Sequence, residues 1–158
     1  MRILFVCLGN ICRSPTAEGV LRRRLVDAGL SEVVEVDSCG TGAWHIGKAP
    51  DARAQAAASQ REVDLSQLRA RQLDAEDFAR FDYLLAMDDG NLASLEAMRP
   101  ADCVAHIGLL LDFAGDSGRA VPDPYYGGEQ GFDEVFGLVE RAADGLIEHL
   151  RQRLEHAQ

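Results

Sequence analysis

Hydrophobic positions divide the chain into short apolar runs and longer segments with helical spacing. The short runs are rich in aliphatic and β-branched residues, and they predict strands over residues 2–6, 33–38, 81–86 and 104–107. Helical spacing or an Ala-rich composition predicts helices over residues 14–28, 52–61, 74–79, 89–98 and 131–154. The intervening segments 39–50 and 108–130 contain many Gly and Pro residues, and we interpret them as loops.

The order of the first elements indicates an α/β fold with a parallel sheet. The strand over 2–6, the helix over 14–28 and the strand over 33–38 form a βαβ unit, which has parallel strands and a right-handed connection. A length of 158 residues, without a repeat or linker, favours a single domain over residues 1–158. Because ligands bind beyond the carboxyl ends of parallel strands, we expect the loops there to form the functional site.

Composition and charge exclude several classes of protein. Hydrophobic residues make up 47% of the chain and charged residues 27%, as in folded globular proteins. A formal charge of −10 argues against nucleic acids or anionic membranes as partners. The N-terminus lacks the pattern of a signal peptide, so we expect a cytoplasmic protein with reduced cysteines. The four cysteines form no zinc-type spacing, and no metal is expected; they are Cys7, Cys12, Cys39 and Cys103.

Residues 7–15, which read Cys-Leu-Gly-Asn-Ile-Cys-Arg-Ser-Pro, combine a thiol with the features of an anion site. They connect a predicted strand to a predicted helix, and such a loop can direct backbone N–H groups toward phosphate oxygens. Its Gly and Asn tolerate the positive φ angles that the turn requires. The helix N-terminus and Arg13 favour the thiolate form of Cys7, and the planar guanidinium can bind two oxygens. The Ser14 hydroxyl can donate a hydrogen bond to the thiolate.

Asp123 lies between two prolines in the predicted loop 108–130. A carboxylic acid can protonate the leaving oxygen of a phosphate ester, and the resulting carboxylate can then activate water. The flanking prolines restrict the backbone and thereby fix where the carboxyl group points. An Asp between prolines is more often only a turn residue, so its interpretation as the acid depends on the Cys7 loop. Because the loop and Arg13 supply positive potential, no cofactor is expected.

These motifs together resemble the low-molecular-weight protein tyrosine phosphatases. The resemblance rests on residues 7–15 followed by Ala17-Glu18, on residues 123–127, and on matches at 38–41, 44–47, 69–73 and 83–88. It covers nearly the whole chain in the right order. It implies a four-stranded parallel sheet with helices on both faces and a phosphate-binding loop between the first strand and the first helix.

The resemblance also implies a role for each residue of the site. Cys7 would be the nucleophile that forms a phosphocysteine, Arg13 would bind the phosphate, and Asp123 would act as general acid and base. The rest of the phosphate-binding loop would be Leu8, Gly9, Asn10, Ile11, Cys12 and Ser14, with Ser38 as support for the Asn. A slot for a phenyl ring would have as its walls Ile11, Trp44, Tyr125 and Tyr126.

Further implications concern redox chemistry and partners. In such enzymes the second loop cysteine, here Cys12, can form a reversible disulfide with the nucleophile. The substrate would be a protein carrying phosphotyrosine, with a bacterial tyrosine kinase as one candidate. One departure is visible: many members have a His shortly before the Arg-Ala-Arg-Gln run, where this chain has Leu68, so we do not expect that residue to brace the loop as a His would.

Other functions could use the same loop. A thiol-coupled arsenate reductase would need two further cysteines close together, whereas Cys39 and Cys103 are distant in the sequence. A non-hydrolytic phosphoryl carrier would keep phosphate on Cys7, and a phosphopeptide-binding module would only hold it. Neither of these gives a role to Asp123, so hydrolysis is the favoured interpretation.

Overall fold

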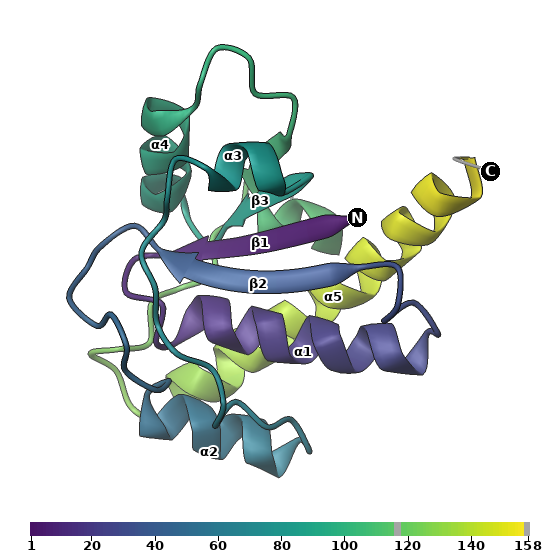
Figure 1. The fold of residues 1–158 in the computed structure, drawn as a ribbon. Helices are drawn as coiled ribbons and strands as arrows, with labels where there is room; N and C mark the ends of the chain where they lie inside the picture. The colour runs from purple at the N-terminus through teal and green to yellow at the C-terminus, as the bar shows by residue number, and fades with distance from the viewer. Residues whose placement is uncertain (116–117, 157–158) are drawn as a thin grey trace.

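A single four-stranded parallel sheet forms the centre of the protein in the computed structural model, which describes residues 1–115 and 118–156 (Figure 1). The strands lie in the order β2-β1-β3-β4, and each adjacent pair is parallel. Their bounds are β1 (Arg2–Cys7), β2 (Glu35–Gly40), β3 (Tyr83–Ala86) and β4 (His106–Leu109). The α/β class, the four parallel strands and their approximate positions are therefore confirmed.

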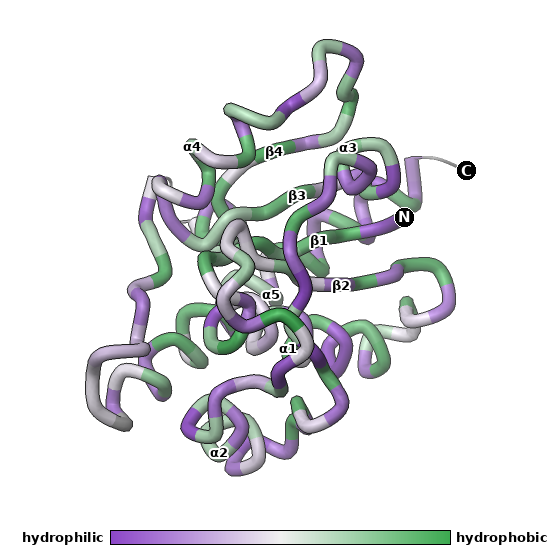
Figure 2. The backbone as a smooth tube through the Cα atoms, turned by 60° about the vertical axis from the view of Figure 1, so that its left-hand side comes forward, coloured by the Kyte–Doolittle hydropathy of each residue, from purple (hydrophilic) through white to green (hydrophobic). Residues whose placement is uncertain are grey.

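Helices cover both faces of this sheet, as predicted. The helices are α1 (Arg13–Asp27), α2 (Ala52–Gln60), α3 (Asp77–Arg80), α4 (Asp89–Met98) and α5 (Glu129–His156). Alternation along β1 supplies both interfaces: Ile3 and Phe5 belong to a core with α1, α2 and α5, and Leu4 and Val6 belong to a second core with α3 and α4. Figure 2 shows hydrophobic residues along β3 and a mixture of hydrophobic and hydrophilic residues along α1 and α2.

Three predicted strands begin two residues too early, namely those over 33–38, 81–86 and 104–107. The third strand starts at Tyr83 because Phe81 caps the C-terminus of α3. Val33 and Val34 both donate their backbone N–H to Leu30 O, and this turn delays the start of β2 to Glu35. β4 begins two residues later than predicted, because Val104 is 98% exposed and lies outside the sheet. The β-branched composition of both segments resembles a strand, but tertiary contacts set the register.

The predicted loop 108–130 also contains regular structure. A 3-10 helix, η1 (Leu110–Ala114), follows β4 directly, and α5 begins at Glu129. Burial of Leu110 and Leu111 in the core explains why this glycine-rich segment is ordered near β4. Among the described residues, no helix is long and apolar enough to span a membrane.

Candidate active site

The loop between β1 and α1 is held against the end of β2. Thr41 N donates to Cys7 O at 2.9 Å, and Gly42 N donates to Leu8 O at 2.9 Å. Gly40 allows this close approach, because a Cβ atom there would lie 2.7 Å from Leu8 O. Asn10 adopts a φ of 57°, so the predicted positive φ occurs at the Asn of the loop. The backbone therefore curls tightly around the thiol.

The nucleophile candidate lies at the base of this curl. Cys7 is 2% exposed and occupies the last position of β1. The backbone N–H of Asn10 donates to Cys7 Sγ at 3.3 Å, and Ser14 Oγ lies 3.0 Å from the same sulfur. A thiolate at this position has two hydrogen-bond partners and faces the N-terminus of α1, which favours negative charge.

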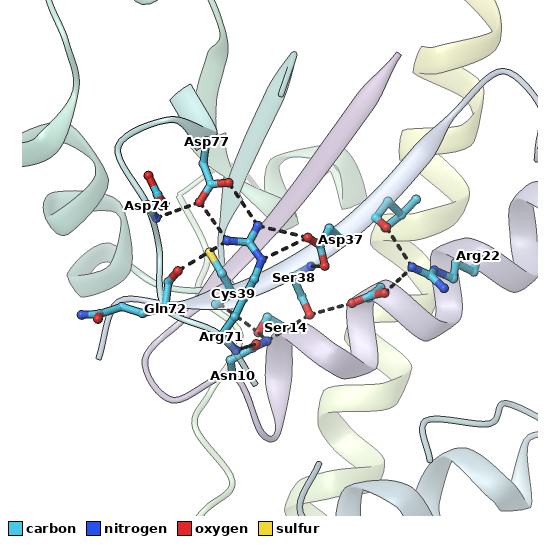
Figure 3. A network of polar contacts seen from close by, with 12 residues as sticks. Asn10, Ser14, Arg22, Asp37, Ser38, Cys39, Arg71, Gln72, Asp74 and Asp77 are labelled. Carbon is cyan, nitrogen blue, oxygen red and sulfur yellow. Dashed lines mark hydrogen bonds and ion pairs between the residues drawn. The ribbon is translucent and has the colours of Figure 1, made fainter. Parts of the chain in front are cut away.

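Asn10 links Ser14, Ser38 and the Arg71 segment through hydrogen bonds (Figure 3). Its Nδ2 donates to Ser14 Oγ at 2.8 Å and to Ser38 Oγ at 3.0 Å, while its Oδ1 accepts from Arg71 N at 3.0 Å. Both Nδ2 protons are used, so Ser14 accepts from Asn10 and can donate its own proton to Cys7. Ser38 therefore contacts Asn10 directly, as the family resemblance implies.

A second row of charged residues supports this network. Ser38 Oγ donates to Glu18 Oε1 at 2.7 Å, and Arg22 pairs with Glu18 at 2.6 Å. Burial raises the pKa of Glu18, even though Ser38 and Arg22 stabilise its charged form. On the other side, Arg71 pairs with both Asp37 and the buried Asp77, each at 3.0 Å (Figure 3).

These supporting roles were missed by the sequence analysis, because they depend on contacts between distant segments. The i,i+4 spacing of Glu18 and Arg22 on the predicted helix could have indicated their ion pair. Nothing in the sequence indicated the contact of Glu18 with Ser38 or that of Arg71 with Asn10. The Arg71 segment joins the sheet through an isolated parallel bridge between Gly40 and Gln72. Leu68 packs against the hydrophobic core, so the polar support of the loop comes from Glu18 and Arg71.

Arg13 lies in the first turn of α1 with only 3% of its side chain exposed. Its Nη1 donates to Asp88 Oδ2 at 2.6 Å and to Val121 O at 3.0 Å. Asp88 in turn accepts from Asn91 N and caps α4, so the carboxylate is itself fixed. The guanidinium thus has a defined orientation at the pocket. The role of Asp88 was also missed, although an Asp between a strand and a helix is a usual capping signal.

Asp123 approaches the loop from the other side of the pocket. Its Oδ2 lies 3.7 Å from Arg13 Nη2, and its Oδ1 accepts from Tyr125 N at 3.1 Å. Val121 N donates to Met87 O at 2.7 Å, which attaches this segment to the end of β3. The structure therefore brings the Asp123 carboxyl group to the thiol and the guanidinium, although it lies more than a hundred residues from them in the sequence.

A pocket of about 400 Å³ lies above these groups. The residues that line it include the aromatic side chains predicted as walls, and the full set is Cys7, Leu8, Gly9, Ile11, Cys12, Arg13, Trp44, His45, Asp123, Tyr125 and Tyr126. Trp44 is 69% exposed and Tyr126 is 94% exposed, so both extend from the rim. The side chains of Asn10, Ser14 and Ser38 do not line the pocket; Asn10 hydrogen-bonds to both serines on the buried side of the loop.

The remaining cysteines differ from Cys7 in their surroundings. Burial, reinforced by Asp51 and by Cys7, raises the pKa of the Cys12 thiol to about 12. Burial also raises the pKa of Cys39. Cys39 lies in β2 at one edge of the sheet, and Cys103 precedes β4 at the other edge. Within residues 1–115 and 118–156, no cluster of His, Cys, Asp and Glu could hold a metal ion.

Comparison with known proteins identifies relatives of this chain. A family model described as low molecular weight phosphotyrosine protein phosphatase matches residues 2–156. The chain is similar to a low molecular weight protein-tyrosine-phosphatase of Streptomyces coelicolor, with 43% identity over 160 residues that cover 98% of this chain and 96% of the relative.

Solved structures are similar over the same length. A protein tyrosine phosphatase from Entamoeba histolytica, with Hepes in the active site, has a TM-score of 0.91 and 38% identity, covering 96% of this chain and 97% of that one. The Drosophila arginine phosphatase DARP has a TM-score of 0.89 and 34% identity, covering 95% of this chain and 98% of that one.

Proposed function

The chain belongs to the low molecular weight phosphotyrosine protein phosphatases, and we propose that Cys7, Arg13 and Asp123 carry out hydrolysis in its active site. The protein is thus a hydrolase of phosphoric monoesters that acts on phosphotyrosine. The observation that carries the residue assignments is the convergence of all three side chains on one pocket. We propose further that residues 1–158 form one catalytic domain.

In the first step, the Cys7 thiolate attacks phosphorus and the bond to the phenolic oxygen breaks. Arg13 and the inward N–H groups of the loop bind the three phosphoryl oxygens, whose charge is spread in the transition state. Asp123 gives its proton to the departing phenolic oxygen. The products of this step are a free phenol, a phosphocysteine and an ionised Asp123.

In the second step, water attacks the phosphocysteine. Asp123 accepts a proton from the water as its oxygen bonds to phosphorus, and the phosphorus–sulfur bond breaks. The Ser14 hydroxyl, 3.0 Å from Sγ, stabilises the thiolate as it leaves. Inorganic phosphate is released and Asp123 is protonated again, so one carboxyl group serves both steps.

The pocket favours an aryl phosphate. Trp44, Tyr125 and Tyr126 supply aromatic surface beside the phosphate position, and a flat phenyl ring can stack or pack edge-on there. For the protein substrate we propose one that carries phosphotyrosine, with a bacterial tyrosine kinase as a candidate class. We propose a cytoplasmic location, since the mechanism needs a reduced thiol and all four cysteines are free.

The alternative functions fit these contacts less well. Arsenate reduction needs a relay of nearby thiols, whereas Cys39 and Cys103 lie at opposite edges of the sheet. A phosphoryl carrier would need a phosphocysteine that survives in water, whereas the proximity of the Asp123 carboxyl group to Arg13, at 3.7 Å, supports a role in activating that water.

The test is a comparison of substrates under one set of conditions. We expect kcat/KM for a phosphotyrosine peptide to exceed kcat/KM for the matched phosphoserine peptide by at least about 100-fold, which is the usual size of general-acid and binding effects. A phosphoarginine peptide and thiol-coupled arsenate reduction are run alongside. Preference for phosphoarginine, arsenate reduction, or release of one equivalent of phenol without further turnover would overturn the proposal.

A further inference from the structure

Arg53, in the first turn of α2, connects the phosphate-binding loop to the segment that carries Asp123. Its Nη2 donates to Tyr125 O at 2.9 Å, and its Nη1 donates to Gly127 O at 3.2 Å. Both carbonyl groups belong to the turn that directly follows Asp123. A single guanidinium therefore holds two points of that turn.

The guanidinium is itself fixed by Asp51. Arg53 Nε lies 3.1 Å from Asp51 Oδ1, and Nη2 lies 3.0 Å from Asp51 Oδ2, which is a bidentate pair. These hydrogen bonds lower the pKa of Asp51, so the carboxylate is charged at neutral pH. Asp51 N in turn donates to Ile11 O at 2.8 Å. This places the ion pair directly against the phosphate-binding loop.

Aromatic contacts further restrict the side chain. The Arg53 guanidinium lies 4.7 Å from the centre of the Phe132 ring and 5.7 Å from that of Tyr125. These distances are typical of cation–π contacts. Phe132 is buried, so this stacking anchors the guanidinium to α5 as well.

Tyr125 completes the connection to the acid. Its carbonyl oxygen accepts from Arg53, and its N–H donates to Asp123 Oδ1 at 3.1 Å. The contacts thus run from Ile11 through Asp51, Arg53 and Tyr125 to Asp123. The connection defines where the carboxyl group lies relative to the loop that binds phosphate.

We propose that Arg53 is a positioning residue that holds Asp123 within reach of the leaving-group oxygen. This inference rests on the proposed role of Asp123 as general acid. Arg53 does not line the pocket, so it acts on the acid through the backbone of residues 123–127. If the carboxyl group is displaced, it donates its proton less effectively to the leaving-group oxygen, while the loop and Arg13 continue to bind phosphate. Loss of Arg53 therefore affects esters of weakly acidic phenols more than esters of acidic phenols.

The test compares Arg53→Met and Arg53→Lys across a series of aryl phosphates with phenols of different acidity. We expect Arg53→Met to lower kcat/KM for phosphotyrosine about 10- to 100-fold, a part of the general-acid contribution, and to affect a nitrophenyl ester several-fold less. Lys cannot form the bidentate pair, so Arg53→Lys should give an intermediate result. Inhibition by inorganic phosphate should stay within about twofold.

Arg61→Met is the matched control. Arg61 caps the C-terminus of α2, stacks on Phe136 at 4.8 Å and pairs with Asp133, but these contacts involve α5 and not the Asp123 turn. This variant should leave the dependence on the leaving group unchanged. Equal losses on all esters in both Arg53 variants, or the same pattern in Arg61→Met, would overturn the inference.

A double variant separates this inference from the proposed function. In an Asp123→Asn background, Arg53→Met should add no further dependence on the leaving group, because the acid is already absent. If Asp123→Asn alone leaves that dependence unchanged, the role of Asp123 is wrong. If Asp123→Asn changes it but Arg53→Met does not, only the positioning role is wrong. Should Arg53→Met fail to fold, Arg53→Lys and Asp51→Asn answer the same question.

Discussion

Ser14 Oγ lies 3.0 Å from Cys7 Sγ and receives a hydrogen bond from Asn10, so its own proton is directed toward sulfur or toward Cys39 O. We expect Ser14→Ala to lower kcat about 10- to 100-fold, because a hydrogen bond to a charged group is worth about 1.5–3 kcal/mol. The phosphocysteine should accumulate, since the thiolate becomes a poorer leaving group. Rapid-quench measurement of the phosphoenzyme checks this, and unchanged phosphoenzyme levels would contradict it. Ser94→Ala in α4 is the control.

Replacement of the nucleophile tests the central assignment. Cys7→Ser should abolish turnover of phosphotyrosine, because an alcohol in this loop is not ionised at neutral pH. Binding of phosphate or vanadate should persist, since Arg13 and the loop N–H groups remain. Turnover and calorimetric binding are measured on the same preparation. Retained hydrolysis would exclude Cys7 as the nucleophile.

Removal of the acid should depend on the substrate. Asp123→Ala should lower kcat/KM for phosphotyrosine by about 100-fold or more, by the usual contribution of a general acid. An ester of a more acidic phenol needs less help and should lose several-fold less. Steady-state kinetics on both esters decides the matter, and an equal loss on both would show that Asp123 has another role.

The contiguous part of this candidate site could be proposed from the sequence alone. Residues 7–14 are adjacent in the chain, and the strand before them and the helix after them fix their relative positions. Asp123 could be proposed for two reasons. Its flanking prolines restrict the direction of the carboxyl group, and cleavage of a phosphate ester by the thiol needs a proton donor for the leaving oxygen. Both assignments depend on the local sequence and on the groups that the reaction requires, and both of these can be recognised from the sequence.

The supporting contacts could not be predicted in this way. Asp88, Arg71 and Arg53 each act on a residue of another segment, and their spacing in the sequence carries no sign of the partner. The predicted starts of β2, β3 and β4 were each two residues too early for a related reason. The turn at Leu30 and the exposed position of Val104, rather than the β-branched composition of residues 33–34 and 104, decided where β2 and β4 begin.

The two cysteines of the loop should react differently. With a pKa of about 12, Cys12 is almost wholly a thiol at neutral pH and should react slowly with iodoacetate. We expect alkylation at Cys7 first, with parallel loss of activity and with protection by phosphate. Peptide mass spectrometry identifies the site, and first modification at Cys12 would contradict the assignment.

Oxidation by peroxide should follow the same order. Cys7 is expected to form a sulfenic acid and then a disulfide with Cys12, which a dithiol reduces. Cys12→Ser should therefore turn reversible inactivation into a loss that dithiol no longer restores. Equal recovery of both proteins would show that Cys12 does not protect the nucleophile.

His149 should make stability depend on pH below neutrality. Its Nε2 lies 2.8 Å from Tyr83 Oη at the end of the sheet opposite the pocket, and burial, with Arg153 and His106, lowers its pKa below the ordinary 6.5. The unfolded chain therefore binds a proton at a higher pH than the folded protein does. Above pH 6.5, His149 is neutral in both states, and the free energy of unfolding should not change with pH on its account. Below pH 6.5, the free energy of unfolding should fall as the pH drops toward the pKa of His149 in the folded protein.

A phenylalanine at this position tests the effect. His149→Phe keeps the packing of a ring against Phe113 and Tyr83 but removes the titrating group. Below pH 6.5 the variant should lose less stability than the wild-type protein for the same drop in pH, although its stability at pH 8 is lower because the hydrogen bond to Tyr83 is lost. Urea unfolding at pH 5, 6, 7 and 8 measures both effects. His156→Phe near the exposed end of α5 is the control, and an identical pH dependence in His149→Phe and wild type would exclude His149 as the cause.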